Sequence, residues 1–198
     1  DLVIIAVAPE TNLAIALERD PTLASRVSEI SIMGGSTTHG NATAAAEYNI
    51  YADPEAASIV FASGIPIRMV GLNVTSTFGV TQTELDRLHA ANGIGRELAG
   101  ALQFYLDRQT STYEHSYAPM HDTCAVIPYI NPLWIEYKPL HVVVECVGTH
   151  TRGMTLCDTR GSVIGGENEN SQTANAQVAI MADADAIIAQ AIADLSHH

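Results

Sequence analysis

Cysteine, basic residues and long apolar runs are scarce in this sequence. The three cysteines are odd in number and show no CxxC spacing, which argues against a disulfide set or a zinc site and predicts reduced, buried thiols in a cytoplasmic protein. The apolar runs, such as residues 2–8, are far too short to cross a bilayer, and no signal-peptide pattern is visible. Nine Lys and Arg residues against 22 Asp and Glu give a net charge of −13, so we expect neither nucleic acid nor a membrane as a partner.

The residues that are present suit one folded unit. The 198 residues are 47% hydrophobic, which is enough to bury the core of one domain of ordinary size. No repeat, low-complexity tract or linker divides them. We therefore expect a single domain over residues 1–196 and interpret His197-His198 as a tag remnant.

The first predicted strand covers residues 2–7, an apolar run rich in β-branched side chains. This pattern is typical of a strand that is buried on both faces of a parallel sheet, and we expect it beside a second strand, Val27–Met33. Between the two strands, Thr11 is positioned to cap a helix.

Strands and helices alternate along the rest of the chain. Asp53 followed by Pro54 and an acidic residue predicts a helix start. The other predicted elements are strands at 65–70, 141–147 and 154–157 and helices at 93–108, 123–130 and 183–195. The alternation predicts an α/β fold with a mainly parallel sheet and flanking helices.

Three polar side chains, Asn41, Glu47 and Asn49, follow the second predicted strand closely. Ligands of open parallel sheets bind beyond the carboxyl ends of the strands, which is where these residues are expected. Amides donate and accept hydrogen bonds and a carboxylate accepts them from neighbouring hydroxyls, so the group suits a sugar or a nucleoside. A polar surface loop explains the spacing equally well.

His121 and Asp122 form a second cluster at the start of a predicted helix. Asp122 is first of all a candidate N-cap, although a capping carboxylate keeps a second oxygen for a ligand. His121 then stands at the same rim, where an imidazole is suited to proton donation. A polar surface or packing role is the ordinary alternative for a lone histidine.

Six short motifs occur in this order: Met33-Gly34-Gly35, Gly40-Asn41-Ala42-Thr43, Glu47-Tyr48-Asn49, Asp53-Pro54-Glu55-Ala56-Ala57, Gly71-Leu72-Asn73-Val74-Thr75 and His121-Asp122. The order resembles that of the inosine-uridine-preferring nucleoside hydrolase family, from about Leu2 to Leu195. The ordered set is specific, whereas no single motif is. The turn at 9–13 also resembles the family's pattern, with Glu10 in place of Leu.

The resemblance implies hydrolysis of the N-glycosidic bond of ribonucleosides to ribose and a free base. It implies that Asn41, Glu47 and Asn49 grip the ribose and that His121 protonates the leaving base. Three residues just before His121 are candidates for contact with the base, namely Tyr113, His115 and Tyr117.

The resemblance also implies one Ca²⁺, for which Asp122 matches a carboxylate ligand and the Val7 carbonyl matches a backbone ligand. The family's D-x-D-x-x-x-D-D loop, which supplies the other carboxylates and the general base, does not occur in this sequence. Because Ca²⁺ takes about six to eight oxygen ligands, two cannot hold it tightly. We therefore expect a C-terminal portion of the family's fold that is impaired on its own.

An open sheet edge is expected beside residues 2–7. Such an edge favours pairing, so the expected partners are a nucleoside and either further copies of this chain or a complementing N-terminal chain. Two alternatives stay open for the function. One is a non-catalytic nucleoside- or ribose-binding or assembly module derived from the same family, and the other is an unrelated α/β domain without a ligand.

Overall fold

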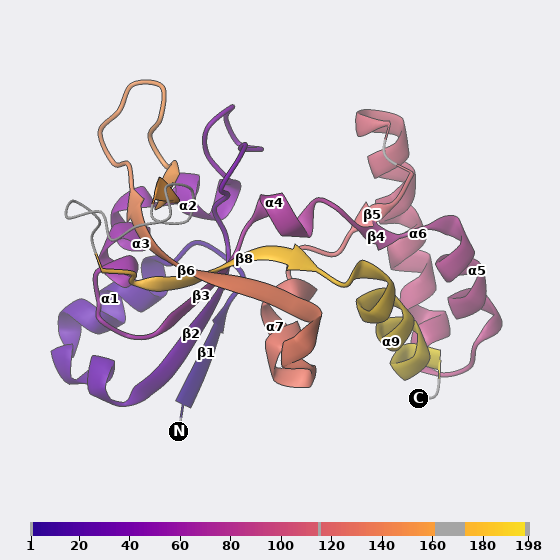
Figure 1. Ribbon diagram of the computed structural model, residues 1–198. Helices are drawn as coiled ribbons and strands as arrows, with labels where there is room; N and C mark the ends of the chain where they lie inside the picture. Colours follow the sequence, from indigo (N-terminus) through magenta and orange to yellow (C-terminus); the bar gives the residue numbers. More distant parts are fainter. Residues whose placement is uncertain (1, 115, 161–172, 197–198) are drawn as a thin grey trace.

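The computed structural model describes residues 2–114, 116–160 and 173–196 (Figure 1). Its main sheet has six strands in the order β1-β2-β3-β8-β6-β7. β1, β2, β3 and β8 run parallel, whereas β6 runs antiparallel to both β8 and β7. The expected α/β class with a mainly parallel sheet is confirmed. The strands are β1 (Leu2–Ala6), β2 (Val27–Met33), β3 (Ile67–Val70), β6 (Ile135–Val144), β7 (Thr155–Asp158) and β8 (Ala176–Ala182).

Alternation along β2 shows which helices cover which face of the sheet. Ile30 and Ile32 are fully buried in the core formed with α1 (Thr11–Arg19) and α3 (Pro54–Phe61). Ser31 points the other way and donates its hydroxyl to the Ala125 carbonyl of α7 (Thr123–Ile130) at 2.7 Å. The sheet therefore has α1 and α3 on one face and α7 on the other.

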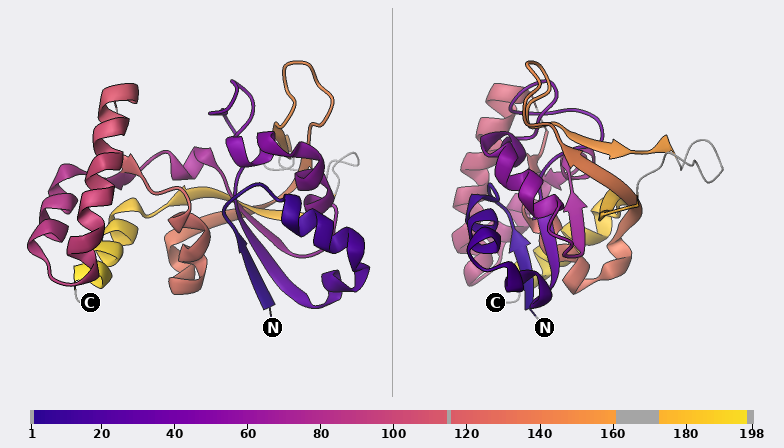
Figure 2. Two further views of the ribbon diagram at one scale, coloured as in Figure 1. Left: turned by 180° about the vertical axis from the view of Figure 1, so that it is seen from behind. Right: turned by 90° about the vertical axis from the view of Figure 1, so that its left-hand side faces the viewer.

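A group of three helices stands beside the sheet in Figure 1 and in the left view of Figure 2. It consists of α5 (Gln82–Ala90), α6 (Ile94–Tyr113) and α9 (Ala184–Ser196). Leu85, Leu88, Leu106 and Ile192 share its apolar core. The short strands β4 (Gly79–Val80) and β5 (Ala118–Pro119) pair at its base and connect it to the sheet.

The expected burial of residues 2–7 is wrong. The strand forms beside β2 as predicted, but β1 is the edge strand of the described sheet. Leu2 is 51% and Ile5 39% exposed, because β2 is the only strand among the described residues that flanks them. Ile4 and Ala6 pack partly against the core. The expectation of an open edge at this strand is confirmed for the described residues.

Capping agrees with the sequence at α3 but not at α1. Asp53 accepts the Ala56 N–H at 3.1 Å and caps α3 as predicted. Thr11 does not cap α1, since Glu10 occupies the N-cap position and makes no side-chain cap bond. The Thr11 hydroxyl instead bonds the Asp53 carboxylate at 2.5 Å, which ties the start of α1 to the start of α3.

Helix ends were less predictable than helix starts. α6 continues to Tyr113, beyond the expected end at residue 108. Its last turn is polar, so the spacing of apolar residues does not indicate where the helix ends. α7 has the expected bounds. Within the described ranges, no helix combines the length and apolar character needed to cross a membrane. All three cysteines are free, but only Cys124 is fully buried.

Candidate active site

One cavity of about 720 Å³ opens between the loop after β2, α4 (Leu72–Thr75), α6 and the segment before α7. Asn41 and His121, predicted from separate clusters, both line it. Glu47, Asn49 and Asp122 are not among its lining residues. The fold thus brings one member of each cluster to the same cavity.

The loop that carries Asn41 folds back on itself. The N–H groups of Asn41 and Ala42 both donate to the Ala46 carbonyl, and the Asn41 side-chain oxygen accepts the Tyr48 N–H at 2.9 Å. A Cβ at Gly40 would lie 2.3 Å from the backbone nitrogen of Ala46, so only glycine fits there. With its oxygen engaged, Asn41 has its amide N–H₂ left to donate to a ligand.

Glu47 is buried, with 3% exposure, and serves the backbone rather than the cavity. Its carboxylate caps α2 (Tyr48–Ala52) by accepting the N–H groups of Asn49 and Ile50, and it also accepts the Gly35 N–H at 3.0 Å. Burial raises the pKa of Glu47, while these N–H donors lower it. The carboxylate therefore fixes the start of α2 against the end of β2.

Asn49 is also turned inwards. It is 8% exposed, and its side-chain nitrogen donates to the Met33 carbonyl at 2.9 Å. This bond ties the start of α2 to the last residue of β2. Asn49 and Glu47 together hold the loop that presents Asn41.

The base of this loop is fixed from the other side by the β6–β7 hairpin. The buried Thr155 hydroxyl accepts the Ser36 N–H at 2.9 Å and donates to the Ser36 carbonyl at 2.8 Å. Gly35 has φ +69°, and a Cβ there would lie 2.7 Å from the Thr155 methyl carbon. The Gly pair after β2 is therefore required for the hairpin to approach.

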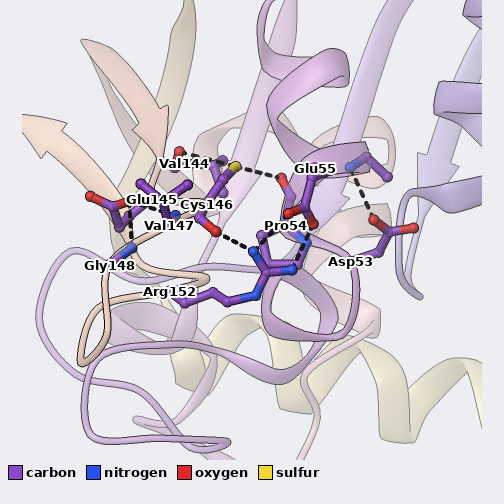
Figure 3. A network of polar contacts seen from close by, with 10 residues as sticks. Asp53, Pro54, Glu55, Val144, Glu145, Cys146, Val147, Gly148 and Arg152 are labelled. Carbon is purple, nitrogen blue, oxygen red and sulfur yellow. Dashed lines mark hydrogen bonds and ion pairs between the residues drawn. The ribbon is translucent and has the colours of Figure 1, made fainter.

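A second set of contacts holds the hairpin over α3 (Figure 3). Both terminal nitrogens of Arg152 pair with the two carboxylate oxygens of Glu55 at 2.7 Å, and Arg152 also donates to the Cys146 carbonyl. The Cys146 thiol lies within reach of the Pro54 carbonyl at 3.5 Å. These contacts hold the hairpin against the start of α3, and none of the residues involved lines the cavity.

His121 is held by a buried hydroxyl. Its Nδ1 lies 2.8 Å from the Thr75 Oγ1, and Thr75 is completely buried at the end of α4. Burial lowers the pKa of His121, and the negative charge of Asp122 opposes this shift. With Nδ1 engaged, Nε2 is the ring nitrogen that can act on a ligand.

Asp122 occupies the N-cap position of α7, but its side chain does not cap the helix. Only its carbonyl accepts a helical bond, from the Ala125 N–H. The residue is exposed. Burial raises the pKa of the Tyr105 hydroxyl, and the negative charge of Asp122 raises it further. Asp122 therefore adjoins the cavity-lining His121 in the chain without lining the cavity itself.

The described residues do not fit a Ca²⁺ site. They contain no group of three His, Cys, Asp or Glu side chains close enough to hold a metal ion. The two ligands that the resemblance implies, Asp122 and the Val7 carbonyl, would supply only two of the about six to eight oxygens that Ca²⁺ takes. The implied ligand pair is therefore insufficient within this part of the chain.

Aromatic and amide side chains of α6 form a cavity wall, of which the sequence indicated only Tyr113. Tyr105, Gln109 and Tyr113 follow one another at four-residue spacing and all line the cavity. Tyr113 was a candidate for base contact. Tyr117 donates instead to the Ser76 carbonyl at 2.7 Å, and His115 lies outside the described residues. The four-residue spacing was the signal available in the sequence.

Asn73 also lines the cavity and was quoted only as part of a motif. Its side chain donates to the Ala179 carbonyl of β8 at 2.9 Å and accepts the Thr37 N–H at 3.2 Å. It therefore links the loop after β2 to the centre of the sheet.

Comparison with known proteins gives a consistent result. The model of the family described as inosine-uridine preferring nucleoside hydrolase matches residues 1–189. A pyrimidine-specific ribonucleoside hydrolase, RihB of Escherichia coli O157:H7, is 36% identical over 186 residues, which cover 93% of this chain and 57% of that protein. A putative RihB of Shigella boydii has the same identity, and 74% of its length is covered.

Solved structures show the same relationship. A plant nucleoside hydrolase, PpNRh1, superposes with a TM-score of 0.89 at 32% identity, covering 99% of this chain and 62% of that one. A purine-preferring ribonucleoside hydrolase from Gardnerella vaginalis gives a TM-score of 0.86 at 31% identity, covering 100% of this chain and 61% of that one. The chain thus spans about three-fifths of the length of these structures.

Proposed function

Since this chain belongs to the inosine-uridine preferring nucleoside hydrolase family, we propose that the protein hydrolyses the N-glycosidic bond of ribonucleosides to ribose and a free base. The observation that carries the proposal is the shared cavity of Asn41 and His121. Its volume of about 720 Å³ suits a ligand of nucleoside size. Relatives are named for both pyrimidine and purine nucleosides, so the proposal covers both classes.

In this proposal the ribose lies on the side of Asn41 and the base on the side of α6. The Asn41 amide donates to ribose hydroxyls, and Glu47 and Asn49 act by holding its loop and its neighbours. Tyr105, Gln109 and Tyr113 offer π faces and an amide to the base. Contacts to hydroxyls that tighten in the transition state contribute to the rate as well as to binding.

His121 is the proposed general acid. When the bond between the anomeric carbon and the base nitrogen breaks, its electron pair leaves with the base, which takes a proton from Nε2 of His121. A water oxygen bonds to the anomeric carbon, and its proton must pass to a base on the opposite side of the leaving group. No Asp or Glu is found among the described cavity-lining residues, so we propose slow turnover by this chain alone.

The open edge of β1 supports a proposal about partners. Charged residues and prolines normally protect an edge strand from pairing. The segment from Leu2 to Ala8 contains neither. We propose that an added strand, from another copy or from a complementing chain, pairs with β1. The free thiols of Cys124, Cys146 and Cys157 support a cytoplasmic location.

The test of the function is direct. The purified chain is incubated with inosine or uridine, with and without Ca²⁺, and ribose and free base are measured. Titration of ribose or a nucleoside, followed by NMR, is expected to shift the Asn41 side-chain signals. Release of ribose supports the proposal. The proposal is contradicted if no ribose is released and the signals of Asn41 and His121 do not change.

A binding module without catalysis is the second candidate. It is favoured by the lack of a described carboxylate on the cavity wall. Its distinguishing result is nucleoside binding at Asn41 with no hydrolysis, even after a complementing N-terminal segment of the family has been added. Recovery of hydrolysis on that addition favours the enzyme.

A further inference from the structure

Glu10 is a buried carboxylic acid that the proposed reaction does not use. It follows the turn after β1 and occupies the N-cap position of α1. Only 2% of it is exposed, and neither of its carboxylate oxygens has a hydrogen-bond partner among the described residues. An ionised carboxylate in such a place is strongly unfavourable, because it has neither water nor a donor from another described residue.

The charged groups that act on Glu10 are both negative. They are Glu47 and Asp53, which stand at the N-caps of α2 and α3. Each has donors of its own: Glu47 accepts backbone N–H groups, and Asp53 accepts the Ala56 N–H and the Thr11 hydroxyl. Glu10 is therefore the member of this group of three carboxyls whose charge no other described residue stabilises by a hydrogen bond.

These surroundings favour the neutral acid. Burial raises the pKa of Glu10 to about 8, against a smaller lowering by its own backbone N–H, and the charges of Glu47 and Asp53 raise it further. Glu10 thus keeps its proton at a pH where exposed carboxyls are ionised.

We propose that Glu10 is a proton-binding site that keeps the start of α1 docked on α2 and α3, and that loss of this proton opens the turn between β1 and α1. To reach water, the ionised side chain must leave its buried position and move away from the charges of Glu47 and Asp53. The Thr11 bond to Asp53 starts at the adjacent residue, so this movement pulls on the contact that joins α1 to α3. Because Glu47 also anchors the loop of Asn41, the opening is transmitted towards the cavity.

The expected pH dependence follows from the two states. In the open state Glu10 is exposed and titrates near its ordinary pKa of 4.5, whereas in the closed state it titrates at about 8. Between these values the closed state holds a proton that the open state has lost. Opening is therefore favoured about tenfold more for each pH unit of increase, and it levels off above about pH 8.

The Ala14 amide reports on this opening, since it donates to the Glu10 carbonyl at 2.9 Å in the first turn of α1. Its hydrogen-exchange protection factor, corrected for the intrinsic exchange rate, is measured by NMR from pH 5.5 to 8.5. We expect a decrease of about tenfold per pH unit up to about pH 8. In Glu10→Gln the protection factor is expected to be independent of pH.

Glu18→Gln is the matched control, because it makes the same chemical change at an exposed position of the same helix. It should retain the pH dependence of the unmodified chain. Persistence of the dependence in Glu10→Gln would overturn the proposal.

A titration of the unmodified chain keeps the proposal testable if Glu10→Gln does not fold. The carboxyl carbons of ¹³C-labelled glutamate are followed by NMR, and Glu10 is assigned through its backbone. The expected midpoint lies two or more pH units above that of an exposed glutamate, within the folded chain. A midpoint below about pH 5.5 would mean that Glu10 has a partner for its charge and binds no proton at neutral pH.

Discussion

The Nδ1 atom of His121 lies 2.8 Å from the Oγ1 atom of Thr75, although the two residues belong to separate elements. Thr75 is completely buried, so its hydroxyl is fixed in place and fixes the imidazole in turn. This contact gives the imidazole of His121 a defined orientation at the cavity. The role of this contact can be tested by NMR even if the chain alone does not hydrolyse nucleosides.

Replacing Thr75 by Val should change the titration of His121. The substitution keeps the shape of the side chain but removes the partner of Nδ1, so the ring loses its preferred tautomer. We expect mixed tautomers in ¹⁵N NMR spectra and, where turnover is measurable, a rate reduction of about fivefold, equivalent to one hydrogen bond of about 1 kcal/mol. Thr75→Ser retains the hydroxyl and should behave like the unmodified protein. Identical His121 spectra in both variants would contradict this role.

The pH dependence of the proposed acid follows from its lowered pKa. Burial shifts the midpoint of His121 below the ordinary value of 6.5, so the protonated form is lost before neutral pH is reached. The acid-dependent part of the rate should therefore fall as the pH rises through this lowered midpoint. ¹H NMR titration of the ring and the pH profile of kcat should give the same midpoint. A midpoint above 6.5 would show that Asp122 outweighs burial.

Removal of the His121 side chain should separate substrates by their leaving groups. In a form of the protein that turns over, His121→Ala should slow natural nucleosides by about 10²–10⁴-fold, because protonation of the leaving base is lost. An activated aryl riboside does not need this proton and should be slowed far less. Equal losses for both substrates would assign His121 a positioning or packing role only.

Asn41→Ala and Asn49→Ala should differ in what they impair. Asn49 is buried and satisfies the Met33 carbonyl, so its loss should lower the free energy of unfolding by about 1–3 kcal/mol as well as weaken ribose binding and turnover. Asn41 lines the cavity, so its loss should weaken ribose binding with a smaller effect on stability. Urea unfolding and ligand titration of both variants make the comparison. Equal stability losses would mean that the Asn41 loop is as structural as Asn49.

Calcium binding by this chain alone should be weak. Asp122 and the Val7 carbonyl are too few oxygens for a hard cation, so we expect a Kd of about 1 mM or weaker by calorimetry. Asp122→Asn should abolish what remains. A micromolar Kd for the unmodified chain would reveal ligands that the described residues do not show.

Self-association through β1 should respond to charge at the sheet edge. Ile5→Lys puts a charge beside the unpaired backbone and should lower the associated fraction in sedimentation experiments. Ile15→Lys is the control, because Ile15 is similarly exposed but lies on α1. Circular dichroism checks that both variants fold. An equal decrease in association for both would indicate general solubility rather than edge pairing.

Local pattern in the sequence was sufficient for the family and for several of the elements, although the central strand β8 was not among the predicted ones. The apolar run at the start predicts a strand, Asp53-Pro54 predicts a helix start, and the ordered motifs identify the family, because each depends on neighbouring residues along the chain. The sequence also placed Asn41 and His121 at strand and helix ends, where sites are built.

Tertiary structure decided what these elements face. Continuous apolar character cannot reveal whether a strand has one neighbour or two, so β1 was expected inside and lies at the edge. The distinction between Asn41 at the cavity and Asn49 in the interior depends on which backbone carbonyl lies nearby. Likewise, the turn motif identifies Glu10 as a polar substitution, but only the packing of three helix starts around it leaves its carboxyl without a donor. Burial and partners are set by contacts between segments far apart in sequence, which no local pattern records.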